Sequence, residues 1–361
     1  MFYWLADFKD VFSFVNIFRY ITFRAGMAAV TTFGLCILFG PYFINKLRQL
    51  KIQEVAKRAD CPDLDQFQQS KQGTPTMGGI FIIGSILLSV LLWADLSNAF
   101  ILLTFVTCLF LAVLGFIDDY VKLTQTAKRG LDKRTKLFWE VLLGCSIGAF
   151  IYFNTAISTN VDVPFLKNLV LHLGIGYIPF AALVVVGTSN AVNLTDGLDG
   201  LAIGCVLIVS LTLGVLSYIT GNFNFSEYLF IPYIAGAGEL TIFCAAIIGA
   251  SLGFLWFNCP PASIFMGDTG SLSLGGTLGV IAVLIKKEIL LVLMGGVFVM
   301  EALSVIIQVV SFKTRGKRVF KMAPFHHHLQ FLGWKESQII IRFWILAIIF
   351  AMLTLTTLKI R

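Results

Sequence analysis

The feature that most constrains this chain is the recurrence of apolar stretches long enough to cross a lipid bilayer. A transmembrane helix needs about 20 consecutive apolar residues. About ten such stretches occur, near residues 25–45, 74–94, 96–117, 137–155, 170–190, 200–220, 237–257, 268–285, 289–311 and 339–358. Only 13% of the residues are charged, against roughly 25% in soluble domains. The sequence therefore predicts an all-α integral membrane protein with about ten transmembrane helices.

We expect a single polytopic membrane domain over residues 1–361, because no internal repeat or separate soluble domain is evident. Residues 1–24 alternate aromatic and charged side chains, which is typical of an interfacial helix. The seven cysteines are odd in number and scattered, so neither a disulfide framework nor a zinc site is expected. His172, alone in the fifth stretch, is expected to be a packing residue.

The distribution of Lys and Arg predicts the orientation. If the loops alternate sides, most of the 27 Lys and Arg residues fall on one side, and the positive-inside rule makes that side cytoplasmic. Both termini then lie outside. The main cytoplasmic loops are expected at residues 46–73, 118–136, 188–200, 258–268 and 312–337. The acids at the ends of the stretches also fall on this side, which predicts a cytoplasmic-facing site.

Two adjacent carboxylates, Asp118 and Asp119, stand where a long apolar stretch meets a basic loop. Like charges side by side repel each other and resist desolvation, and a helix C-terminus prefers Lys or Arg. A functional role is therefore favoured over a solvated helix end. On a helix, Lys122 lies on the face of both acids, where it neutralises them or holds a phosphate.

Two other polar segments each permit a structural and a functional interpretation. Lys71 precedes the run Gly73-Thr74-Pro75-Thr76, which suits either a helix start or an anion site. Asn190, Asn193, Asp196 and Asp199 follow the fifth stretch. These four residues form either a turn with a helix cap or a pocket for a base or a sugar.

Two further segments precede the eighth and the last stretches. Asp268, between Gly267 and Thr269, is either a helix cap or a magnesium ligand, since hard cations prefer carboxylate oxygens. His326, His327 and His328 follow a basic strip. Consecutive residues on a regular helix cannot all face one metal. These imidazoles are better suited to bind phosphates or to move a proton.

Three runs together resemble one family. They are Pro324-Phe325-His326-His327-His328, Asn193-Leu194-Thr195-Asp196-Gly197-Leu198-Asp199-Gly200 and Phe265-Met266-Gly267-Asp268-Thr269-Gly270. The chain resembles the polyprenyl-phosphate N-acetylhexosamine-1-phosphate transferases from Lys71 to the last stretch. The histidine run is similar to that of the branch that transfers phospho-MurNAc-pentapeptide from UDP-MurNAc-pentapeptide to undecaprenyl phosphate, giving lipid I and UMP. The resemblance implies Mg2+ dependence, a homodimer and a place in the bacterial plasma (inner) membrane, with no nucleic-acid partner.

The resemblance also implies roles for particular residues. Catalytic roles fall on Asp118, Asp119, Asp268 and His327, with Asp268 as the metal ligand. Substrate-binding roles fall on Lys71, Thr76, Lys122, Asn190, Asn193, Asp196, Asp199, Phe265, Gln308, His326 and His328.

Three alternatives remain open at this point. The chain is similar also to a sibling branch that transfers GlcNAc-1-phosphate to the same carrier. An ion-coupled transporter would use its acids as relays, but it should place them near the bilayer midplane. Within the transferase, either the carrier phosphate attacks the donor directly or an Asp first forms a covalent intermediate. Direct attack is expected, because the carrier phosphate is already ionised.

Overall fold

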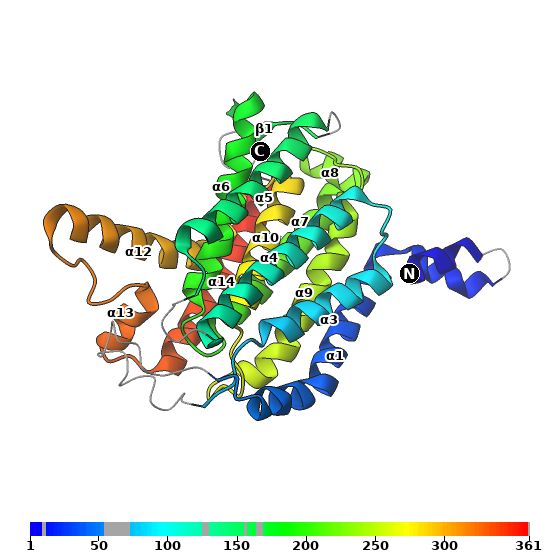
Figure 1. Ribbon diagram of the computed structural model, residues 1–361. Helices are drawn as coiled ribbons and strands as arrows, with labels where there is room; N and C mark the ends of the chain where they lie inside the picture. Colours follow the sequence, from blue (N-terminus) through cyan, green and yellow to red (C-terminus); the bar gives the residue numbers. More distant parts are fainter. Residues whose placement is uncertain (9–11, 54–72, 125–129, 155–156, 164–168, 360–361) are drawn as a thin grey trace.

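The computed structural model describes residues 1–8, 12–53, 73–124, 130–154, 157–163 and 169–359. This part of the chain is a helical bundle with one two-stranded hairpin (Figure 1). It contains eight helices that are long and apolar enough to cross a membrane. They are α1 (Ile21–Gln49), α4 (Ala99–Thr124), α5 (Lys133–Phe153), α6 (Tyr177–Thr195), α7 (Leu201–Thr220), α9 (Leu240–Asn258), α12 (Gly296–Arg315) and α14 (Glu336–Thr356). The prediction of an all-α membrane protein is confirmed.

Two further helices complete the bundle. These are α3 (Gly79–Trp93), which is shorter, and α10 (Gly267–Leu284). The remaining elements of the described chain are short: η1 (Phe2–Phe8), η2 (Ser13–Arg19), β1 (Asn160–Asp162), β2 (Val170–His172), η4 (Gly174–Gly176), α8 (Phe223–Leu229), η5 (Ala237–Glu239), α11 (Glu288–Met294), α13 (Phe325–Phe331) and η6 (Thr357–Lys359).

The ninth predicted stretch, residues 289–311, is not one continuous helix. α11 ends at Met294 and α12 begins at Gly296, with Gly295 between them. Glycine is the weakest helix former after proline, and the absence of a side chain at Gly296 lets the start of α12 approach Phe350 of α14. From this break α12 projects sideways from the bundle (Figure 1).

The fifth predicted stretch, residues 170–190, also begins differently. Its first residues form β2, which pairs antiparallel with β1, so that His172 lies opposite Asn160. His172 is exposed and its Nδ1 lies 2.8 Å from Oδ1 of Asn160, so the expectation of a packing histidine was wrong. Pairing with β1, rather than the apolar content, accompanies the extended conformation of these residues.

Helices extend into two of the loops expected from the sequence. α4 continues to Thr124, so Asp118 and Asp119 lie on the helix itself. On its other face Phe116 stacks on Tyr120 one turn later, so the helix keeps an apolar side while its acids turn inward. α6 likewise continues to Thr195. Most of the expected loop 46–73 lies outside the described residues.

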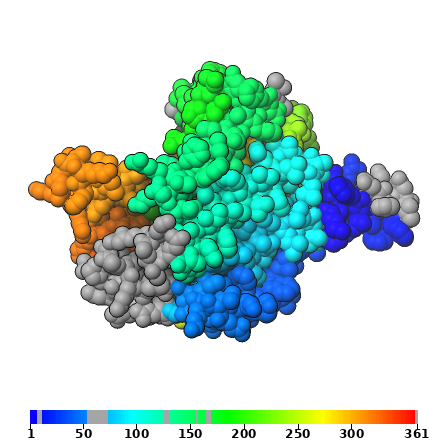
Figure 2. Space-filling view, viewed as in Figure 1, coloured from blue at the N-terminus to red at the C-terminus, as the bar shows by residue number. Residues whose placement is uncertain are grey.

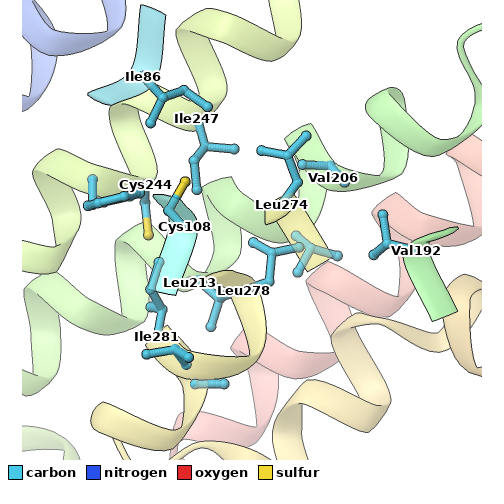
Figure 3. Packing of buried hydrophobic residues seen from close by; sticks show 14 of the residues in the cluster. Ile86, Cys108, Val192, Val206, Leu213, Cys244, Ile247, Leu274, Leu278 and Ile281 are labelled. Atoms are coloured by element: carbon cyan, nitrogen blue, oxygen red, sulfur yellow. The ribbon is translucent and has the colours of Figure 1, made fainter. Parts of the chain in front are cut away.

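α10 lies at the centre of the bundle and is buried on every side after its first two residues. Figure 3 shows Leu274, Leu278 and Ile281 of this helix packed among apolar side chains of α3, α4, α6, α7 and α9. Close packing on every side holds such a helix in position. At its first turn it approaches Gly115 of α4 so closely that a side chain there would overlap the backbone of Asp268.

The N-terminal segment projects from the opposite side of the bundle to α12 (Figures 1 and 2). Instead of the single interfacial helix expected, η1 and η2 are two short 3-10 helices. They are anchored where Phe2 and Phe18 pack against Trp93 of α3. On α12, large apolar side chains such as Leu303, Ile306 and Val310 are exposed, which is the pattern expected of a surface that faces lipid.

Candidate active site

Three carboxylates converge where α4 ends and α10 begins. Asp118 and Asp119 come from α4 and Asp268 from the first turn of α10. One oxygen of each lies within 4.8 Å of one from each of the others, and this is the only group of three potential metal-ligating side chains found in the described chain. The sequence predicted that these acids share one side of the protein, and the structure places them in contact.

Asp119 holds the first turn of α10 in place. Its carboxylate accepts hydrogen bonds from the backbone N–H of Asp268, at 3.1 Å, and of Thr269, at 3.0 Å. The Thr269 hydroxyl donates a third bond, at 2.8 Å. Gly267 precedes them with a φ of +75° and lies so near Asp119 that a Cβ would be 2.8 Å from its Oδ2. A carboxylate from one helix thus caps the positive end of another.

Two lysines bridge the other two carboxylates. Lys122 Nζ lies 2.7 Å from Oδ2 of Asp118 and 3.0 Å from Oδ2 of Asp268. Lys136 Nζ lies 2.8 Å from Oδ2 of Asp268 and 3.9 Å from Oδ2 of Asp118. The predicted shared face of Asp118 and Lys122 is confirmed. Lys136 appeared in the sequence only as one cation of a basic loop.

A short segment before α5 closes over Asp118. The backbone N–H of Leu131 donates to Oδ1 of Asp118 at 2.7 Å. Gly130 has a φ of +103°, and a Cβ there would lie 2.5 Å from the same oxygen. Oδ1 is therefore held by backbone, while Oδ2 faces the two ammonium groups.

The segment before α3 lies against the start of α10. Phe265 donates its N–H to the carbonyl of Pro75 and accepts a bond from Gly78, both at 2.8 Å. Thr76 is therefore beside the Phe265 segment, and both residues are half-buried. Lys71 lies outside the described residues, so its predicted role is untested.

Asn190 and Asn193, near the end of α6, point to different helices. Asn193 donates from Nδ2 to the hydroxyl of Ser271 in α10, at 2.9 Å. Asn190 donates from Nδ2 to Oε2 of Glu140 in α5, at 2.6 Å. Glu140 was not predicted as a site residue, although an isolated acid at the start of the apolar stretch 137–155 was an available signal.

The turn after α6 contains the other two predicted acids. Asp199 is buried and its Oδ2 accepts from the backbone N–H of Ala262, at 3.0 Å. Its own N–H donates to Oε1 of Glu336. Asp199 thus ties this turn to the segment that leads into α10. Asp196 is half-buried and follows the last residue of α6.

The histidine run lies in the first turn of α13. Glu301 of α12 accepts the His326 backbone N–H, at 3.2 Å, and lies 3.1 Å from its Nδ1. The ring of His326 packs directly on Gly197, so α13 lies beside the turn that carries Asp196. Glu301 was missed, although it too is an isolated acid within an apolar stretch, 289–311.

The neighbouring histidines contact their own segment. His327 Nδ1 lies 2.8 Å from Oε1 of Gln330, and His328 Nδ1 accepts the N–H of Lys321 at 3.1 Å. The carboxamide of Gln308 is used in a similar way. Its Oε1 accepts from Val319 and Phe320, and its Nε2 donates to the carbonyl of Phe320. Gln308 therefore holds the segment before α13.

The central cluster can bind cations and anions at once. Carboxylate oxygens are the ligands that Mg2+ prefers, and the donor set of Asp118 and Asp268 fits such an ion. Asp119 fits less well because backbone and hydroxyl groups of the first turn of α10 hold both its oxygens, whereas Oδ2 of Asp118 and Oδ2 of Asp268 face lysine side chains, which a bound cation would displace. The ammonium groups of Lys122 and Lys136 suit the negative oxygens of a phosphate.

Comparisons with known proteins identify relatives over the whole chain. A family model described as Glycosyl transferase family 4 matches residues 100–286. A second, described as Phospho-N-acetylmuramoyl-pentapeptide-transferase signature 1, matches residues 71–83. The chain is 53% identical over 346 residues, 96% of both chains, to the phospho-N-acetylmuramoyl-pentapeptide-transferase of Citrifermentans bemidjiense. It is 50% identical over 362 residues, 100% of both chains, to that of Desulforapulum autotrophicum.

Proposed function

This chain belongs to the phospho-N-acetylmuramoyl-pentapeptide-transferase family, and we propose that it transfers phospho-MurNAc-pentapeptide from UDP-MurNAc-pentapeptide to undecaprenyl phosphate. The products are lipid I and UMP. The structural observation that supports this proposal is the cluster in which Lys122 and Lys136 bridge Asp118 and Asp268. Joining two anionic phosphates requires positive charge close to both of them and a group that aligns the attacking oxygen.

The reaction exchanges one phosphorus–oxygen bond for another. An oxygen of the carrier phosphate attacks the phosphorus that bears the sugar, and the bond from that phosphorus to the UMP oxygen breaks. We favour direct attack over a covalent enzyme intermediate, because the carrier phosphate is already ionised. Isolation of a phospho-sugar attached to Asp118 or Asp119 in the absence of carrier would contradict this mechanism.

The contacts suggest a different role for each residue of the cluster. Lys122 and Lys136 bind phosphate oxygens and offset their charge. Asp118, whose Oδ1 is held by Leu131, positions the attacking phosphate and accepts its proton where one is present. Asp119 holds the first turn of α10, and with it Asp268, beside Asp118 and the two lysines. His326 lies on α13 and packs against the turn at Gly197. It contributes to the donor pocket together with Asp196.

We also propose that Mg2+ is the cofactor. Asp268 would hold it, together with Asp118, and the bound ion would offset negative charge on the transferred phosphate. An Asp268→Asn variant should lose magnesium-dependent turnover. Direct binding of Mn2+, followed by its paramagnetic signal, should weaken in the same variant without reference to activity. Unchanged binding and turnover would remove Asp268 from the metal site.

The orientation and assembly are part of the proposal. The basic loops support a site on the cytoplasmic side of the bacterial plasma membrane, with both termini outside. Membership of the family leads us to propose a homodimer, which mass measurement in detergent micelles would test.

The experiment that tests the function is UMP release by the purified protein in detergent with undecaprenyl phosphate. UDP-MurNAc-pentapeptide and UDP-GlcNAc are compared, with and without magnesium. We expect magnesium-dependent release from the muramoyl donor. Release from UDP-GlcNAc alone would assign the chain to the sibling reaction, and no release from either donor would reject the transferase.

A further inference from the structure

A buried carboxylate outside the central cluster, Glu140, stands at the site end of the contact between α5 and α6. Its exposed fraction is 1%. Gly144 and Gly148 follow it on the same face of α5. At Gly144 a Cβ would lie 2.6 Å from Cα of Ala182, and at Gly148 it would lie 2.7 Å from Cα of Ile178. The two backbones are therefore in near contact, and this contact fixes Glu140 in place.

Glu140 also lies one turn after Lys136 on α5, within electrostatic range of Asp118 and Asp268. On the neighbouring helix, Asn193 binds Ser271, which is itself one turn after Asp268. The end of α6 that carries Asn190 is thus held between the two helices that supply Lys136 and Asp268.

Two hydrogen bonds, to Glu140 and to Val186, determine which way the carboxamide of Asn190 faces. A side-chain amide has two N–H donors and one carbonyl acceptor. Nδ2 of Asn190 donates to Oε2 of Glu140 at 2.6 Å and to the carbonyl of Val186 at 2.9 Å. The carbonyl of Val186 can only accept, so the NH2 group must face it, and its second N–H meets Glu140. Both donors are used, and the carbonyl oxygen Oδ1 is the group left to present.

We propose that Glu140 is a positioning residue for donor recognition in the transfer reaction. By fixing the NH2 group of Asn190, it leaves Oδ1 of this half-buried residue as the acceptor for the donor substrate. The matching group on the sugar nucleotide is a hydrogen-bond donor, an amide or imide N–H or a hydroxyl, and not a phosphate oxygen. This inference rests on the proposed function and extends it.

The second oxygen of Glu140 allows a different role to be tested. Oε1 is buried and makes no hydrogen bond to the described residues, so Glu140 could instead act through its charge on Lys136. The two roles separate in Glu140→Gln. Glutamine keeps a carbonyl that accepts from Asn190 but carries no charge.

The experiment measures UMP release by four variants, Glu140→Leu, Glu140→Gln, Asn190→Ala and the double variant Glu140→Leu/Asn190→Ala. Leu142→Ala, at an exposed position of the same helix, is the control. We expect Glu140→Leu to raise the KM for UDP-MurNAc-pentapeptide roughly tenfold or more, with an unchanged KM for undecaprenyl phosphate. Glu140→Gln should restore the donor KM. Asn190→Ala should match Glu140→Leu, and the double variant should be no worse than either.

Several results would overturn the inference. If Glu140→Gln is as impaired as Glu140→Leu, the charge is what matters. A lower melting temperature with an unchanged donor KM would make Glu140 structural only. If Glu140→Leu cannot be purified, Asn190→Ala removes the same bond from the other side, and an unchanged donor KM there rejects the inference.

Failure of the proposed function would look different. The wild-type protein would then give no UMP from the muramoyl donor. The same comparison of variants can be made with UDP-GlcNAc turnover or, without turnover, with the rise in melting temperature that each sugar nucleotide produces. A loss of that rise in Glu140→Leu, restored in Glu140→Gln, supports the positioning role independently. An equal rise in all variants rejects it.

Discussion

Both the backbone N–H and the side-chain hydroxyl of Thr269 donate to the same carboxylate oxygen of Asp119, at 3.0 and 2.8 Å. This pair holds the start of α10 against the end of α4, and so places Asp268 beside Asp118. The neighbouring acids therefore have different duties. Asp119 maintains the geometry, whereas Asp118 faces the lysines.

Substitution of the two acids should separate these duties. Asp119→Ala removes bonds to a buried helix start and should lower the free energy of unfolding by roughly 3 kcal/mol, with loss of turnover. Asp118→Asn keeps an oxygen for the Leu131 N–H but turns an NH2 group toward Lys122. It should therefore lower the free energy of unfolding less than Asp119→Ala does, by roughly 1 kcal/mol, while turnover falls roughly 100-fold or more. Unfolding in detergent and UMP release are measured on both. Equal destabilisation by the two substitutions would contradict the division.

Lys136 should be required for turnover although the sequence did not single it out. Lys136→Met leaves Lys122 alone with two carboxylates, and we expect a fall in kcat of roughly 100-fold. Lys133→Met changes an exposed lysine of the same helix and serves as the matched control. A Lys136→Met enzyme with the kcat of that control would exclude Lys136 from the site.

The close approach of α4 to α10 can be tested at Gly115. A side chain there would overlap the backbone of Asp268, so Gly115→Ala should destabilise the protein by roughly 1–3 kcal/mol and lower turnover. Gly84→Ala is the control, because nothing lies within 4 Å of the added Cβ. In α3 it should be neutral or stabilise by roughly 0.5–1 kcal/mol. Denaturation curves of both variants decide the matter. The packing argument fails if they coincide.

Cys259 provides a test of orientation. It is exposed in the segment between α9 and α10, at the site end of the bundle. In a background without Cys61 and Cys145, a membrane-impermeant maleimide should label it in inside-out vesicles and not in intact cells. In the same background with Cys259 also replaced, His172→Cys, at an exposed position of β2 beyond the far end of α5, should show the opposite pattern. Reversed labelling would place the site outside.

Local spacing predicted part of the site correctly. The separation of Asp118 and Lys122 implied a shared helical face, and their 2.7 Å contact confirms it. The pairing of Lys136 with Asp268 spans 132 residues. No local pattern predicts such a contact, because it depends on how α4, α5 and α10 pack together.

Hydropathy predicted where the helices lie but not how each one ends. It could not separate β2 from α6, because apolar content is the same in a short strand and a helix start. It also treated Glu140 and Glu301 as tolerated charges, whereas both bind a predicted site residue, Asn190 and His326 respectively. An acid isolated in an apolar stretch therefore indicates a site residue better than the apolar residues around it do.

The hydrogen bonds between Thr269 and Asp119 also have a consequence for biosynthesis, because 150 positions of sequence separate the two residues. A ribosome that has made α4 has produced both adjacent acids, yet the helix start that Asp119 holds does not exist until α10 has been translated. The three-carboxylate cluster is consequently completed late in translation, and we expect a nascent chain that stops before Gly267 to be inactive. If the intervening helices were inserted incorrectly, Thr269 would not reach Asp119, and the cluster would not form.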